Sequence, residues 1–223
     1  MSIVRPEAST TSAGLVPVGR GLCVAFLGID GSGKSTLLQR LADAPPDAFT
    51  GVSVRHLSPL KVRRQGNSSD PHSTPARGLA TSLLKSAYWF VEYVAGYRKN
   101  VAPELADGRL VLFDRYLVDA LVDPRRYRYG APMWVLKLVW HFVPKPDFTL
   151  FLDAPVEVLR ARKQEVEPET MQRLRSAYRS LVAADPRGRI VDVSGDVEQA
   201  LANVLEVLAA ESGTVRGLSR ASS

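Results

Sequence analysis

The stretch AFLGIDGSGKST, residues 25–36, has the residue types and the spacing that bind phosphate groups. It satisfies the pattern G-x-x-x-x-G-K-[ST], in which glycines let consecutive backbone N–H groups curl around an anion. Lys34 can reach the outer phosphates of a nucleoside triphosphate, and the Ser35 hydroxyl can coordinate Mg²⁺. The predicted triphosphate-binding residues are Gly28, Asp30, Gly31, Ser32, Gly33, Lys34, Ser35 and Thr36.

The alternative for this stretch is a chance glycine turn, and its place in the chain argues against that. The motif requires a strand before it and a helix after it, and both patterns are present. Kinases, GTPases and ATPases share such a loop. The chain lacks the Asn-Lys-x-Asp sequence that usually reads the base in GTPases, and its 223 residues are few for the larger ATPase classes. A small nucleotide kinase fits best.

The elements that must position this loop alternate between apolar runs and helical patterns. Near-continuous apolar strands separated by helices indicate a parallel sheet covered on both faces. The sequence therefore predicts an α/β fold with three layers and a five-stranded parallel sheet, as in P-loop NTPases. The five predicted strands lie at 22–27, 52–57, 109–114, 148–153 and 189–194.

A helix beginning near residue 79 shows the clearest period. Its apolar residues recur at steps of three and four, which predicts one long helix with a buried stripe made of Leu79, Leu83, Ala87, Val91 and Val94. The segment 58–75 has no apolar period and many turn formers, so we expect a long loop there. The other predicted helices lie at 34–43, 132–142, 156–184 with a break near Pro168, and 197–211.

Length and composition limit the number of domains, the cellular location and the class of ligand. The chain fits one domain, expected at 21–211, with flexible tails at 1–20 and 212–223, where Ser, Thr, Ala and Gly are frequent. No apolar run is long enough to cross a bilayer and no signal sequence is evident, so we expect a cytoplasmic protein without a membrane partner. The single cysteine, Cys23, lies in an apolar run and reads as a buried thiol. The net charge of +6 suits phosphorylated small molecules better than nucleic acid, for which no binding motif is present.

Three segments, the phosphate-binding loop among them, carry a family resemblance. GIDGSGKST, ADGRLVLFDRY and PDFTLFLDAPVEVLRARK together resemble the thymidylate kinases, a family of P-loop nucleoside-monophosphate kinases with a parallel sheet core. The resemblance runs from about Leu22 to Leu208. Its specific pieces are Asp30 in the loop, the triplet 114–116 at a strand end, and Leu152-Asp153 before an arginine-bearing helix.

The resemblance implies a role for each of these residues. Arg115 would grip the acceptor phosphate, which its place at a strand's carboxyl end beside the loop also favours. Asp114 would order Mg²⁺ or its waters, and Asp30 would accept a hydrogen bond from an acceptor hydroxyl. The alternative for Asp114 and Arg115 is a structural ion pair.

A lid over ATP is expected just after the fourth strand. The loop at 28–36 has no arginine of its own, so Arg160, Arg162 and Lys163 are the candidates for closing over ATP, and the choice between the two arginines stays open. The alternative is a solvated basic helix face. The predicted catalytic residues are therefore Lys34, Asp114, Arg115, Arg160 and Arg162, with Ser35 and Asp114 as the predicted metal ligands.

The acceptor region departs from the family pattern. The family's Arg-Glu-Pro-Gly-Gly-Thr stretch is replaced by RHLSPLKVRR, and LVDALVDPRRYRYG follows Asp-Arg-Tyr where serines and Ala-Tyr-Gln are usual. Tyr93 falls where the family's base-reading arginine stands, with Trp89 one turn earlier; both are also candidates for plain core residues. Asp30, Trp89, Tyr93 and Arg115 are the predicted acceptor-binding residues. Further polar groups are expected near the pocket from Asp119, Asp123, Arg125, Arg126 and Arg128.

The sequence thus predicts a kinase that uses Mg-ATP to phosphorylate a small acceptor, with dTMP or another nucleoside monophosphate first. A kinase for a phosphorylated sugar or other metabolite is the second candidate, and an ATP-binding regulatory protein that has lost transfer is the third. The apolar stretch 131–143 is a candidate surface for a homodimer and equally a candidate core helix.

Overall fold

The structure is a computed structural model that describes residues 19–59, 77–163 and 166–221. Two sequence-based expectations concern residues that lie largely outside these ranges. The predicted N-terminal tail, up to residue 18, and the predicted long loop, from residue 60 onwards, lie outside the described residues.

A five-stranded sheet forms the centre of the molecule, and every neighbouring pair of strands is parallel. The strand order is β2-β3-β1-β4-β5. The three central strands are buried along their whole length, because helices cover both faces of the sheet. This confirms the predicted α/β architecture, and each strand lies within two residues of its predicted bounds. The strands are β1 (Leu22–Leu27), β2 (Val52–His56), β3 (Leu110–Asp114), β4 (Phe148–Asp153) and β5 (Gly188–Asp192).

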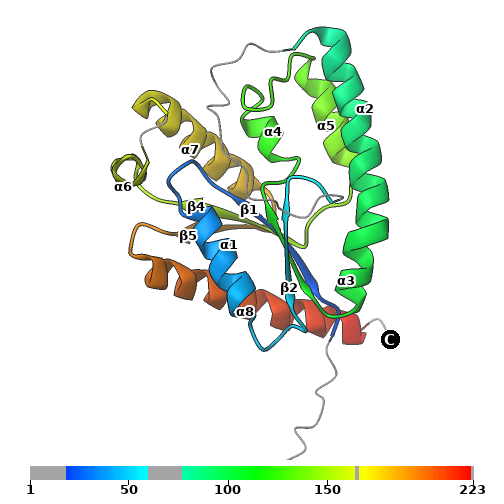
Figure 1. Ribbon diagram of the computed structural model, residues 1–223, viewed down its shortest axis with the longest axis vertical. Coiled ribbons are helices and arrows are strands. Elements are labelled where there is room, and N and C mark those ends of the chain that lie inside the picture. The colour runs from blue at the N-terminus through cyan, green and yellow to red at the C-terminus, as the bar shows by residue number, and fades with distance from the viewer. Residues whose placement is uncertain (1–18, 60–76, 164–165, 222–223) are drawn as a thin grey trace, which may run out of the picture.

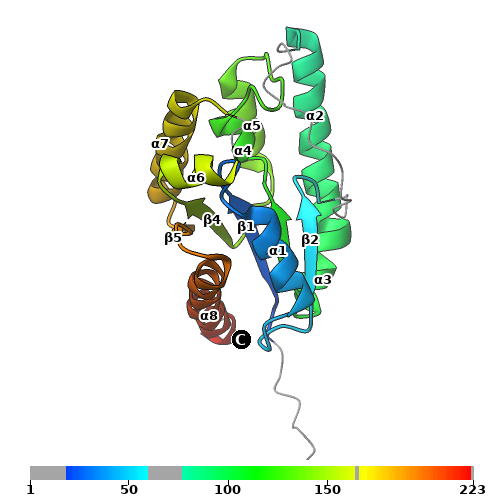
Figure 2. The same ribbon diagram turned by 60° about the vertical axis from the view of Figure 1, so that its left-hand side comes forward.

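The helices form two layers (Figures 1 and 2). The first layer holds the helix after β1 and the last helix of the chain, which contact each other; the remaining long helices cover the opposite face. The predicted break near Pro168 is present. The helices are α1 (Lys34–Asp43), α2 (Leu79–Gly96), a π-helical turn η1 (Tyr97–Val101), α3 (Ala102–Ala106), α4 (Asp119–Val122), α5 (Met133–Phe142), α6 (Val156–Arg162), α7 (Pro168–Ala184) and α8 (Val197–Ala221).

The register of the sheet brings the chemically important strand ends together. Asp114 at the end of β3 pairs with Phe26 of β1 on one side and with His56 of β2 on the other. On the far side of β1, Leu27 pairs with Phe151 of β4. Since all strands are parallel, the loop after β1 and the residues after β3 and β4 meet at one edge of the sheet.

The predicted buried stripe of α2 is wrong. Leu79, Leu83 and Val91 are 55%, 41% and 62% exposed. The buried face carries Ser82, Ser86, Trp89, Glu92, Tyr93 and Gly96 instead.

Hydrogen bonding explains why small polar residues occupy the buried face of α2. The Ser86 hydroxyl lies 3.0 Å from the Tyr129 hydroxyl, and the Ser82 hydroxyl accepts a hydrogen bond from the Gly130 N–H. These bonds pair the helix with the segment after α4. The apolar period therefore identified a real face of the helix, but it could not show which face the rest of the chain covers.

The C-terminal helix also differs from its predicted length. α8 continues to Ala221, whereas the sequence indicated an end at Glu211 followed by a tail. The residues 212–221 are thus helical where a flexible tail was expected. Near the predicted end, Glu211 accepts a hydrogen bond of 2.5 Å from the Arg189 side chain of β5.

Gly188 at the start of β5 tests the close contact between α7 and the sheet. A Cβ at this position would lie 1.9 Å from the Val182 carbonyl oxygen of α7. A side chain there would therefore force the backbones of β5 and α7 apart. We expect Gly188→Ala to lower the free energy of unfolding by about 2–4 kcal/mol, measured by urea denaturation. Gly78→Ala is the control, because a Cβ there meets nothing within 4 Å. Equal losses in both variants would contradict the predicted close contact.

Candidate active site

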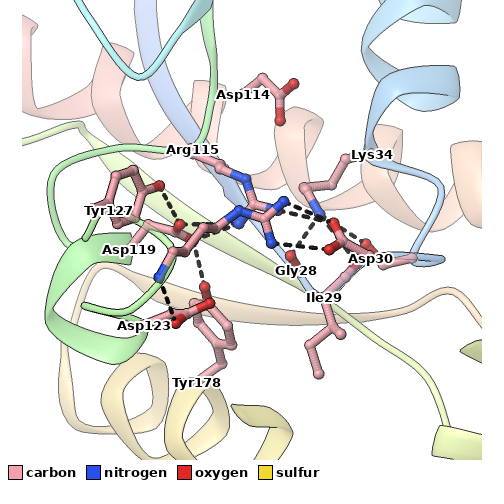
Figure 3. Close-up of polar contacts among 12 residues, drawn as sticks. Gly28, Ile29, Asp30, Lys34, Asp114, Arg115, Asp119, Asp123, Tyr127 and Tyr178 are labelled. Atoms are coloured by element: carbon pink, nitrogen blue, oxygen red, sulfur yellow. Dashed lines mark hydrogen bonds and ion pairs between the residues drawn. The ribbon is translucent and has the colours of Figure 1, made fainter. Parts of the chain in front are cut away.

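The loop between β1 and α1 is built around the ammonium group of Lys34. Gly31 and Gly33 have φ values of 90° and 77°, which side-chain-bearing residues rarely adopt, and α1 begins directly after Gly33. Lys34 Nζ donates to the Gly28 carbonyl (2.6 Å), to the Ile29 carbonyl (3.2 Å) and to the Ser32 hydroxyl (3.2 Å), as Figure 3 shows in part. The amine therefore lies inside the loop where a phosphate group would bind.

Burial, with the nearby charge of Arg115, lowers the pKa of Lys34 from its ordinary 10.5 to about 7. The carboxylates of Asp114, Asp30 and Asp119 act in the opposite direction but are outweighed. An anionic phosphate bound in the loop would supply the missing partner and favour the charged amine. The remaining predicted loop residues, Ser35 and Thr36, are exposed in the first turn of α1.

Arg115 follows β3 in a left-handed conformation with a φ of 72°. Its backbone N–H still donates to the Phe26 carbonyl at 3.0 Å, so the chain turns sharply while staying attached to β1. Its side chain is thereby directed into the space between the loop and α4 (Figure 3). A positive φ at a residue with a large side chain is strained, and such strain persists only where surrounding contacts fix it.

Those contacts are two carboxylates. Arg115 Nη1 donates to both oxygens of Asp119 at 3.1 and 3.0 Å, and Nη2 donates to Asp30 at 3.2 Å. Burial alone would lower the pKa of Arg115, but the Asp119 carboxylate and its neighbours raise it well above the ordinary value. Arg115 is thus a permanent cation beside the phosphate-binding loop.

Asp119 is fully buried and accepts hydrogen bonds from three side chains. Besides Arg115, the hydroxyls of Tyr127 and Tyr178 each lie 2.5 Å from its oxygens (Figure 3). Burial raises the pKa of Asp119, yet Arg115 and the two tyrosines outweigh it and the pKa is lowered. The sequence placed Asp119 only near the pocket; the structure makes it the residue that positions Arg115.

Asp30 holds a second arginine that sequence reasoning did not pair with it. Arg126 Nη1 and Nη2 donate to the two Asp30 oxygens at 2.9 and 3.2 Å. Burial raises the pKa of Asp30, but the hydrogen bonds and charge of Arg126, followed by Arg115 and Lys34, hold it well below its usual range. No sequence period links residues 96 positions apart, so only the fold reveals this pair.

Asp114, the predicted metal ligand, lies at the end of β3 and is almost fully buried. Its Oδ2 lies 3.4 Å from His56 Nδ1, a histidine that the sequence gave no role. Burial raises the pKa of Asp114, but hydrogen bonding from His56 and the charge of Lys34 lower it to about 2. Asp114 is therefore an ionised carboxylate at neutral pH, and its role as a metal ligand stays a prediction.

The predicted lid arginines differ in their surroundings. Arg162 donates to the carbonyls of Val193, Ser194 and Gly195 at 2.8, 3.1 and 2.5 Å, so it holds the connection between β5 and α8. Arg160 lies two residues earlier on α6 and is exposed.

Two arginines of α7 bind the carboxylate of Asp153 at the end of β4. Arg175 donates to both oxygens of Asp153 at 2.6 and 3.0 Å, and Arg179 donates to the same carboxylate. Their spacing of four residues on one helix face was the signal that sequence reasoning could have used.

The predicted acceptor residues Trp89 and Tyr93 are both buried. The Trp89 ring stacks on Tyr129 at a centroid distance of 6.3 Å, and Tyr93 lies edge-on to Tyr116 at 4.8 Å. The Tyr93 hydroxyl donates to the Leu57 carbonyl. Burial of this kind favours the core alternative that the sequence left open for these two residues, and a contact with an acceptor stays a prediction.

Comparisons with known proteins agree on one family. The family model for thymidylate kinase matches residues 26–204. A probable thymidylate kinase from Pyrobaculum calidifontis is 28% identical over 204 residues, covering 81% of this chain and 98% of that protein. A thymidylate kinase from Limosilactobacillus fermentum is 30% identical, covering 83% of this chain and 92% of the other.

Solved structures share the fold. A thymidylate kinase from Ehrlichia chaffeensis superimposes with a TM-score of 0.57 at 17% identity, covering 85% of this chain and 99% of the other. The Candida albicans thymidylate kinase gives a TM-score of 0.59 at 19% identity, covering 86% and 92%.

Asp119→Asn tests the buried charge pair. We expect the variant to lose about 3–5 kcal/mol of unfolding free energy at pH 7, because Arg115 would keep a buried charge without its main counter-ion. The folded-state pKa of Asp119 lies below its unfolded value, so its stabilisation is present above the unfolded pKa and is lost as the pH falls through the folded pKa. Urea denaturation should therefore show a smaller difference at about pH 3 than at pH 7.

Tyr127→Phe is the matched control for that substitution, since it removes one hydrogen bond to Asp119 and no charge. We expect it to lose only about 1 kcal/mol. If Asp119→Asn is no less stable at pH 7 than Tyr127→Phe, the ion pair does not have the assigned role.

Proposed function

The chain belongs to the thymidylate kinase family and is an ATP-dependent nucleoside-monophosphate kinase, and from this premise we propose that its acceptor is dTMP. One observation of the site carries the proposal. The buried cation Arg115, suited to an acceptor phosphate, and the loop amine Lys34, suited to the donor phosphates, lie at the same edge of the sheet around one carboxylate, Asp30.

Phosphoryl transfer needs two phosphate groups held in line and charge on the transferred oxygens neutralised. Lys34 and the N–H groups of the loop would bind the outer phosphates of ATP. Arg115, fixed by Asp119, would bind the acceptor phosphate and keep it facing them. Both side chains are held in place before substrates bind, so little reorganisation is needed during the reaction.

The residues present fit a magnesium ion bound together with ATP. Asp114 is ionised and Ser35 offers a hydroxyl, and both are oxygen ligands of the kind Mg²⁺ prefers. Within the described ranges, no group of three or more His, Cys, Asp and Glu could hold a metal by itself. Mg²⁺ would therefore arrive with the nucleotide, where it neutralises phosphate charge.

For the lid, Arg160 is the better candidate for contacting ATP. Arg162 is engaged with three backbone carbonyls, whereas Arg160 is exposed on the same short helix. α6 lies close to the donor site, because a Cβ at Gly31 would come within 2.5 Å of the Leu159 carbonyl oxygen. Thus a side chain of α6 has only a short distance to reach across the loop.

A second candidate acceptor is a phosphorylated sugar or another phosphorylated metabolite. The observation that favours it is the burial of Trp89 and Tyr93, which leaves the expected base-reading position inside the core.

Among the described residues, no helix is long and apolar enough to span a membrane. We propose that the enzyme works in the cytoplasm, where ATP and such acceptors are found.

The acceptor is identified by ADP release from Mg-ATP across dTMP, other nucleoside monophosphates, nucleosides and sugar phosphates. We expect turnover with dTMP, and we expect Lys34→Ala to reduce it by about 100-fold or more because charge on the outer phosphates is no longer neutralised. Faster turnover with a sugar phosphate would replace dTMP by the second candidate. ATP binding without acceptor-dependent ADP would instead favour a regulatory protein that has lost transfer.

We further propose a homodimer formed through α2 and α5. These two helices contact each other, and together they expose large apolar side chains, namely Leu79, Leu83, Leu84, Tyr88, Phe90, Val91, Trp134, Leu138 and Phe142. Large apolar side chains exposed on neighbouring helices are typical of a protein–protein interface. The sequence proposed 131–143 for this role; α2 supplies most of the surface.

The double variant Leu84→Glu, Val91→Glu should sediment as a monomer under conditions in which the wild type sediments as a dimer, because the new carboxylates would be buried without partners. Analytical ultracentrifugation makes the measurement. Val197→Glu on α8 is the control, since Val197 is also exposed but lies on the other helical layer. A monomeric wild type would contradict the proposal.

A further inference from the structure

The segment after α4 brings an arginine to the loop that the family pattern does not provide there. Arg126 belongs to a hydrogen-bonded turn: its N–H donates to the Asp123 carboxylate at 3.2 Å, and the Arg128 N–H donates to the Arg125 carbonyl at 2.8 Å. From this turn the Arg126 side chain reaches Asp30.

The two arginines on Asp30 are not equivalent. The Arg115 side chain is 7% exposed and also binds the fully buried Asp119. Moving Arg115 would therefore leave a buried carboxylate without its counter-ion. The Arg126 side chain is 19% exposed and makes its two side-chain hydrogen bonds to Asp30 alone, whose own side chain is 13% exposed. Arg126 can leave Asp30 at a much smaller cost in buried, unpaired charge.

Two guanidinium groups occupy most of the hydrogen-bonding capacity of Asp30, three of the about four acceptor positions of a carboxylate. Arg126 donates to both of its oxygens and Arg115 donates to one of them. Departure of Arg126 would free two of these positions for a hydroxyl of the acceptor. The charge near the loop also points to an anion, because Lys34, Arg115 and Arg126 surround Asp30 closely enough to shift its pKa together.

Taking the proposed function as its basis, we infer that Arg126 binds the phosphate of the acceptor and that its ion pair with Asp30 is the resting state of the site. A phosphomonoester dianion offers more oxygens and more charge than a carboxylate, so it draws the guanidinium from Asp30. Asp30 is then free to accept a hydrogen bond from an acceptor hydroxyl. The site thereby selects acceptors that carry both a phosphomonoester and a hydroxyl, and it rejects unphosphorylated nucleosides.

Phosphate binding tests the inference without knowledge of the acceptor. The protein is first saturated with Mg-AMP-PNP, a non-hydrolysable ATP analogue that fills the donor phosphate positions, and inorganic phosphate is then titrated by calorimetry. We expect Arg126→Gln to bind phosphate about tenfold or more weakly than the wild type, because a charge-assisted pair of hydrogen bonds is lost. Arg40→Gln is the control; it also removes a guanidinium from a carboxylate, in the exposed pair Arg40–Glu198, and should bind phosphate normally.

Asp30→Asn separates direct contact from an effect through Asp30. If Arg126 touches the phosphate, adding Arg126→Gln to Asp30→Asn still weakens phosphate binding. If Arg126 only neutralises Asp30, the second substitution changes nothing and the inference is overturned. Unchanged thermal unfolding of the single variants shows that the site remains folded.

The failure of this inference can be distinguished from the failure of the proposed function. A wild type that turns over dTMP with the same KM as Arg126→Gln keeps the function and overturns the role of Arg126. A wild type that ignores dTMP but loses phosphate binding on Arg126→Gln keeps the inference and removes dTMP as the acceptor. The absence of saturable phosphate binding to the wild type also overturns the inference.

Discussion

The site depends on the requirement that buried charges must be paired. Arg115 is buried between Asp119 and Asp30, and a guanidinium in that position would be very costly without both carboxylates. Asp119 in turn needs the hydroxyls of Tyr127 and Tyr178 to satisfy its oxygens. The left-handed backbone conformation of Arg115 persists because the contacts of its side chain with Asp119 and Asp30 offset the strain.

This pairing connects parts of the chain that the sheet alone does not hold together. Asp30 belongs to the loop after β1, Arg115 to the end of β3, and Asp119 to α4. Tyr178 belongs to α7, which packs against β4 and β5. One network of charges and hydroxyls thus fixes the loop after β1, the residues after β3 and helix α7 relative to one another.

The loop follows its sequence motif, whereas the sequence of the segment after Arg115 departs from the family pattern. The loop and its lysine keep the geometry that the motif requires. In the segment after Arg115, Asp119 pairs with Arg115 and Arg126 pairs with Asp30. The Tyr127 hydroxyl donates to Asp119.

The amino-acid sequence by itself determined the sheet, the phosphate-binding loop and the family. Strands and the loop follow from local patterns, apolar runs and glycine spacing, whose physical causes act over a few residues. The sequence could not decide which face of α2 is buried, whether Trp89 is core, or that Asp30 pairs with Arg126. Only the tertiary structure decided these, because the covering partner of a helix face and the counter-ion of a buried charge come from residues far away in the chain.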